Sequence, residues 1–119
     1  MKQTEIDQLE AMYLHYDFKC FVTGNQATQR AHIIGDTIPN RKLYGDRIID
    51  NPLNWLPVDT LESNALVDLG KKDLLNERVT LIIDSLMDVA DKRSEIELIV
   101  RVNIAEKQAK SDTGKVLHA

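Results

Sequence analysis

The chain is poor in cysteine, aromatic residues and long apolar runs, and each shortage excludes a class of structure. Its single cysteine, Cys20, cannot form an internal disulfide and cannot build a cysteine-rich zinc site. Aromatic residues make up only 5% of the chain, so aliphatic side chains must fill most of the core. No apolar run approaches the ~20 residues that a membrane-spanning helix needs, and the polar start MKQTEIDQLE is unlike a signal peptide.

The composition is that of one ordinary soluble domain. The chain has 119 residues, of which 43% are hydrophobic and 29% charged, enough for one core. We therefore expect a single cytoplasmic domain. Between Lys19 and Arg47 there are five basic residues and two acidic ones, a local charge of +3 in a chain whose net charge is −4. The patch favours a phosphate-bearing partner and the acidic total disfavours one, so charge alone leaves nucleic acid open.

The first third of the chain predicts a helix and a hairpin. Residues 4–17 carry apolar side chains at helical spacing, which predicts an N-terminal helix. Short β-type runs at 19–22 and 30–34 flank the turn-forming residues 23–25. We therefore expect residues 20–34 to form a hairpin-like unit.

The next part of the chain predicts a long loop and a short helix. Residues 35–52 are rich in glycine, proline and asparagine, which predicts an irregular connection. Residues 54–58 are expected to be a brief extended segment between prolines. A helix over residues 60–69 follows, with Asp59 at its start and Gly70 at its end as the capping residues.

The last third of the chain predicts helices. Apolar residues from Val79 to Ile104 follow helical spacing and predict C-terminal helices within residues 71–110. Their apolar stripes could complete the core of the monomer or form a homodimer. The tail from Ser111 to Ala119 lacks this periodicity and is expected to be frayed.

Four short patterns between residues 20 and 70 carry a family resemblance. They read CFVTG, RAHII, DNPLNWLPV and SNALVDLG in that order. This set resembles the HNH endonuclease family, and more closely a branch with C-x-x-T-G, A-H-I, a mid-loop asparagine and H-x-x-F-D-x-G. The matching residues are Cys20, Thr23, Gly24, Ala31, His32, Ile33, Asn54, Asp68 and Gly70.

Two positions depart from that pattern. The last histidine is Asn64 here, a variant that the family is known to use, and its side-chain oxygen suits a hard cation. The phenylalanine before the aspartate is Val67. Ala31 matches this branch, which often has alanine there, but many HNH proteins place a metal ligand at that position, so the metal ligands carry over less well than the base.

The resemblance implies an α+β fold with a ββα-metal core over residues 18–70, an N-terminal helix over 1–17 and the C-terminal helices around it. It also implies hydrolysis of DNA with one divalent cation, Mg²⁺ or Mn²⁺, which prefer oxygen ligands. His32 would be the general base, and Asn54 would hold either the active-site loop or His32 itself. Asn64 would bind the metal, and Asp68 is a hypothetical second ligand because residues four apart share a helix face.

Residues of the basic patch are the expected contacts to DNA, in a nuclease of phage, mobile-element or restriction type. They are Arg30, Arg41, Lys42 and Arg47. Two other interpretations stay open. The chain could be an inactive HNH-fold module that binds nucleic acid or protein, or a helical interaction protein in which His32 is a buried side chain among its apolar neighbours.

Overall fold

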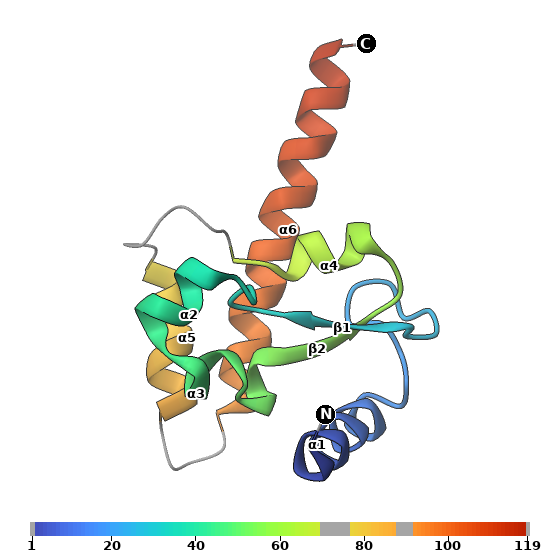
Figure 1. Cartoon of the computed structure of the whole chain (residues 1–119). Coiled ribbons are helices and arrows are strands. Elements are labelled where there is room, and N and C mark those ends of the chain that lie inside the picture. The colour runs from blue at the N-terminus through green and yellow to red at the C-terminus, as the bar shows by residue number, and fades with distance from the viewer. Residues whose placement is uncertain (1, 70–76, 88–91, 119) are drawn as a thin grey trace.

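The computed structural model describes residues 2–69, 77–87 and 92–118 (Figure 1). Seven α-helical or 3-10 segments surround two short strands in this part of the chain, an α+β arrangement as the sequence predicts. In chain order the elements are α1 (Gln3–His15), β1 (Gln29–His32), α2 (Ile38–Tyr44), α3 (Asp46–Ile49), the 3-10 helix η1 (Pro52–Asn54), β2 (Trp55–Val58), α4 (Leu61–Val67), α5 (Glu77–Met87) and α6 (Arg93–His118).

The two strands form an antiparallel ribbon, but not the predicted hairpin at 20–34. β1 pairs with β2, with Ala31 opposite Leu56 and His32 opposite Trp55. Between residues 19 and 26 there is a single bridge. The backbone there folds into a tight turn because the Cys20 sulfur accepts hydrogen bonds from two nearby backbone N–H groups, which a strand would present to a neighbour.

The connection between the strands is helical rather than irregular, so this prediction was also wrong. It contains α2, α3 and η1. Thr37 caps α2 by accepting a hydrogen bond from the backbone N–H of Asn40, and Pro39 lies in the first turn, where no donor is needed. In this connection the turn-forming residues lie at the starts of helices and not in an irregular loop.

Helices α1 and α4 confirm the predicted helices over 4–17 and 60–69, with shorter ends. The cap of α4 is Thr60, whose hydroxyl accepts from the Ser63 N–H, and not Asp59. Gly70, the predicted C-terminal cap, lies outside the described residues. Helix α6 continues to His118, so the expectation of a frayed backbone from residue 111 was wrong. Each residue added to a helix that is already formed gains one backbone hydrogen bond, so α6 can continue over these turns without an apolar stripe.

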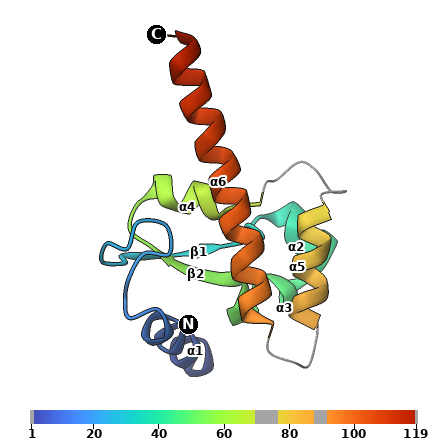
Figure 2. The ribbon, with the colours of Figure 1, turned by 180° about the vertical axis from the view of Figure 1, so that it is seen from behind.

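One apolar core joins the ribbon to the C-terminal helices. Helix α6 lies across the ribbon beside α4 and α5 (Figure 2). The fully buried side chains of this core include Ala31, Ile33, Leu56, Val58, Val67, Ile82 and Val100. Alternate residues of β2 would normally face water, yet all four are buried, because helices cover both faces of the ribbon. Within the described chain, no helix is both apolar enough and long enough to cross a membrane.

Candidate functional site

A hollow of about 200 Å³ opens between the end of β1, the turn that follows it and helix α4. Its lining residues are Arg30, His32, Gly35, Asp36, Thr37, Asn64 and Asp68. Arg30 and His32 share a face of β1 because they are two residues apart. Asn64 and Asp68 lie one helical turn apart, Asp68 being the residue directly after α4. The chain thus brings His32 together with both predicted metal ligands.

Asn54 does not line the hollow but fixes the chain that forms it. Its side chain is completely buried. The Oδ1 atom accepts a hydrogen bond from the Ile34 N–H (2.8 Å), and Nδ2 donates to the carbonyls of Ile34 (3.1 Å) and Ile49 (3.2 Å). Of the two roles left open by the sequence, these contacts match the holding of the loop, which begins two residues after His32.

The surroundings of His32 favour its neutral form. Burial lowers the pKa of the imidazole, the nearby positive charge of Arg30 lowers it further, and the carboxylates of Asp36 and Asp50 oppose these effects. The ring meets Trp55, its partner across the ribbon, edge to face at 6.4 Å between centroids. A neutral imidazole on a solvent-open hollow can accept a proton at neutral pH.

Helix α6 holds the end of α4 in place beside the hollow. Asn103 donates a hydrogen bond to the backbone carbonyl of Asp68 (3.3 Å). The Lys107 ammonium donates to the carbonyls of Ala65 (2.8 Å) and Asp68, and a cation at this position also favours the negative end of the α4 dipole. The C-terminal helices therefore support the site without lining it.

The turn after β1 adds residues that the sequence did not single out. Asp36 and Thr37 line the hollow together with Gly35. Arg41 donates a hydrogen bond to Asp36 and lowers the pKa of that carboxyl. A carbon added to Gly35 would lie 3.7 Å from an Asp68 oxygen, so the missing side chain leaves room beside this carboxylate. In the sequence, Gly35 and Asp36 follow His32 closely, and this was the signal that could have identified these lining residues.

The donor set fits a hydrated oxygen-loving cation better than zinc. In the described ranges, no three His, Cys, Asp or Glu side chains lie close enough together to hold a metal ion. Mg²⁺ keeps several of its waters and needs only one or two carboxylates from the protein. The oxygens of Asn64 and Asp68 at one hollow suit that requirement.

The four basic residues expected to contact DNA have different surroundings. Arg41 pairs with three carboxylates, those of Asp36 (2.6 Å), Asp46 (3.0 Å) and Asp50 (2.8 Å), so its guanidinium is already occupied. Its neighbours make this spot acidic rather than basic, which corrects the picture of Arg41 as a phosphate contact.

The other three remain available for that role. Lys42 and Arg47 are exposed. The Arg30 guanidinium lies 4.5 Å from the centre of the Trp55 ring and lines the hollow. Its buried Nη1 lacks a hydrogen-bond partner among the described residues, although Glu5 Oε1 lies 3.5 Å away as an ion-pair partner.

Comparisons with protein-family models, with curated proteins and with solved structures found no match to this chain. The resemblance therefore rests on residues 20–70 alone, and a functional argument must come from the geometry around His32.

Proposed function

We propose that this chain is an HNH-type, metal-dependent endonuclease that hydrolyses phosphodiester bonds of DNA at the hollow beside His32. One observation carries the proposal. His32, Asn64 and Asp68 come from a strand and a helix far apart in the sequence, yet they line the same hollow. The order β1, β2, α4 is also the order that the resemblance implies.

The side chains divide the reaction between them. Neutral His32 would accept the proton of the water that attacks phosphorus. Asn64 and Asp68 would hold Mg²⁺ or Mn²⁺, which when bound stabilises charge on the phosphate and on the leaving oxygen. Arg30, whose side chain lines the hollow, would donate to a phosphate oxygen. Asn54 would keep the turn after β1 in register with these groups.

The first prediction concerns nicking of supercoiled plasmid. The chain should nick it in Mg²⁺ or Mn²⁺ and not in EDTA. His32→Ala should reduce the rate by about 100-fold or more, the usual contribution of a positioned base. His15→Ala, which removes an exposed histidine from α1, is the matched control and should keep full activity. Unchanged nicking by His32→Ala would remove the base from the proposal.

The pH dependence of nicking follows from the lowered pKa of His32. Because burial favours the neutral ring, the active form persists below the ordinary value of about 6.5 and is lost only in more acid solution. The rate measured from pH 5 to 8 at fixed Mn²⁺ should therefore be flat near pH 7 and fall only in acid solution, with a midpoint below the ordinary value of about 6.5. A midpoint above pH 7 would contradict the assignment of His32 as the base.

The metal ligands can be tested without turnover. Asp68→Ala should abolish Mn²⁺ binding in calorimetry, whereas Asp84→Ala, an exposed aspartate on α5, should not change it. Equal affinity in Asp68→Ala and the wild type would exclude Asp68 as a ligand.

An inactive nucleic-acid-binding module is the second candidate. Two observations favour it: no three His, Cys, Asp or Glu side chains of the described residues lie close enough together to hold a metal ion, and Ala31 beside His32 cannot bind one. Such a module would shift DNA in a gel with strong dependence on salt and would not cut it in any divalent cation.

A further inference from the structure

Helix α6 carries an apolar stripe on the face turned away from its own domain. Leu98 and Val102 are 64% and 44% exposed, and Ala105 and Ala109 extend the same line at spacings of three and four residues. The opposite face, with Ile96 and Val100, is buried in the core. Figure 2 shows the outer face of α6 uncovered by any other element.

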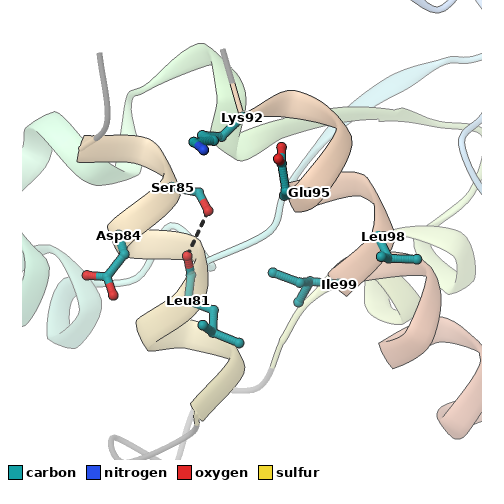
Figure 3. A pocket seen from close by; sticks show the side chains of 7 residues that line it. All are labelled: Leu81, Asp84, Ser85, Lys92, Glu95, Leu98 and Ile99. Carbon is teal, nitrogen blue, oxygen red and sulfur yellow. Dashed lines mark hydrogen bonds between the residues drawn. The ribbon is translucent and has the colours of Figure 1, made fainter. Parts of the chain in front are cut away.

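A second apolar surface adjoins this stripe. Helices α5 and α6 enclose a hollow of about 410 Å³, with Leu81 on one side and Leu98 and Ile99 on the other (Figure 3). Lys92 and Glu95 at its edge carry opposite charges. Leu98 belongs both to the hollow and to the stripe, so the two form one continuous surface.

The C-terminal turns of α6 project beyond the rest of the domain (Figure 1). A free helical end in water is only marginally stable, and helices in proteins gain most of their stability from packing. The stripe runs from the packed part of α6 toward these turns, so a partner on the stripe could support them.

We propose that the occupant of this surface is the α6 helix of a second copy of the chain, packed antiparallel about the point midway between residues 103 and 104. This arrangement places Leu98 opposite Ala109 of the second copy and Val102 opposite its Ala105. A large side chain then meets a small one at each step, which lets two helices pack closely without voids. A parallel pair would set large against large and small against small.

The charges beside the stripe also favour antiparallel packing. Glu95 and Lys110 flank one side of the stripe near its two ends. Antiparallel packing keeps this flank of both copies on the same side of the seam and brings each Glu95 toward Lys110 of the other copy, whereas parallel packing places the two flanks on opposite sides, where these charges do not meet. A twofold axis requires a surface that is complementary to its own reversed copy, as this stripe is. An unrelated partner would not require this property.

The first test is the mass of the full chain in solution by light scattering. We expect twice the mass of the 13.5 kDa chain. The double variant Leu98→Glu, Val102→Glu should have the mass of one chain and an unchanged circular dichroism spectrum, because both positions are exposed. Leu61→Glu, at an 80% exposed leucine on α4, should stay dimeric. A single-chain mass for the wild type, or a dimer of the double variant, would overturn the proposal.

Disulfide trapping tests the direction. Leu98→Cys and Ala109→Cys are oxidised separately and as a mixture, with the wild type, whose Cys20 is buried, as the blank. Antiparallel packing puts identical positions about 16 Å apart along the helices, too far for a bridge, so only the mixture should form cross-linked dimers. Cross-linking of either variant alone would show parallel packing and overturn the inference.

Discussion

Strand β2 is flanked by two polar side chains that perform similar tasks by opposite means. Asn54 directly precedes the strand and Asp59 directly follows it. Each ties a distant segment to the ribbon: Asn54 ties the turn after β1, and Asp59 ties the turn at residues 20–28. Asn54 is completely buried, and the described partners of its side chain are backbone groups, whereas Asp59 lies near the surface and mostly binds side chains.

The partners of Asp59 all donate. They are the hydroxyls of Thr23 (2.7 Å) and Ser63 (2.7 Å), the amide of Asn25 (3.1 Å) and the thiol of Cys20 (3.4 Å). These hydrogen bonds, chiefly from Ser63 and Thr23, hold the pKa of the Asp59 carboxyl well below its usual range. A carboxylate suits this place because it only accepts hydrogen bonds.

The partners of Asn54 include one donor and two acceptors. Only a carboxamide can accept from the N–H of Ile34 and donate to two carbonyls at once. Two side chains of nearly equal shape are therefore not interchangeable, and the direction of their partners' hydrogen bonds decides which is needed.

The largest expected effect is that of Asn54→Asp. The change puts a carboxylate against the carbonyl oxygens of Ile34 and Ile49 in a fully buried place, and should lower the free energy of unfolding by more than about 3 kcal/mol in urea titrations. Burial should raise the pKa of the introduced acid, so the variant should lose stability as the pH rises from about 4 through that raised value.

Asn51→Asp, the same change three residues earlier, is the matched control. The Asn51 side chain accepts from the N–H of Leu53 at the start of η1, a role that a carboxylate also fills. Its amide donates one long hydrogen bond, to the carbonyl of Leu86 (3.5 Å), against two shorter ones from Asn54 in a fully buried place. We therefore expect Asn51→Asp to cost much less stability than Asn54→Asp. Equal loss of stability in Asn51→Asp and Asn54→Asp would show that the hydrogen bonds donated by Asn54 do not explain why a carboxamide is needed at that position.

Asp59→Asn should have a smaller effect with the opposite dependence on pH. Because the folded-state pKa of Asp59 is depressed, its contribution is present above the ordinary value of about 3.9 and is lost as the pH falls through the folded value. Melting temperatures of the wild type and the variant should differ at pH 7 and converge in acid. Asp84→Asn, the same charge change at an exposed aspartate of α5, is the control and should change the melting temperature at pH 7 less than Asp59→Asn does.

The smallest change is expected for Cys20→Ser. The hydroxyl can still donate to Asp59 and accept from the N–H groups of Val22 and Thr23, so the loss should stay below about 1 kcal/mol in urea titrations. Cys20→Ala, which removes all three hydrogen bonds, should be less stable than the serine variant. The reverse order would show that the sulfur acts by packing alone.

Local patterns predicted some of this structure well. Helical spacing located α1 and capping residues located α4 to within a few residues, and the ordered motifs selected three residues that share one hollow. The pairing of β1 was missed because its partner lies across a long connection, and strand pairing at that distance leaves no mark in the local pattern.

The surroundings of single side chains were not predictable. The sequence shows that Arg41 is basic, but only the fold shows that three aspartates surround it. Aspartate is a common capping residue at helix starts, but the side-chain partners of Asp59 come mainly from a turn more than 30 residues away. Burial and long-range contact, which decide what a charge does, are properties of the folded chain.

The reach of α6 back to Asp68 has a consequence for synthesis. A nascent chain of about 100 residues would already contain every predicted site residue, but not Asn103 and Lys107, whose side chains hold the backbone of Asp68. The hollow beside His32 would then lack these two supports until α6 has left the ribosome, so a nuclease at this site would acquire its full activity only after that helix has folded onto α4.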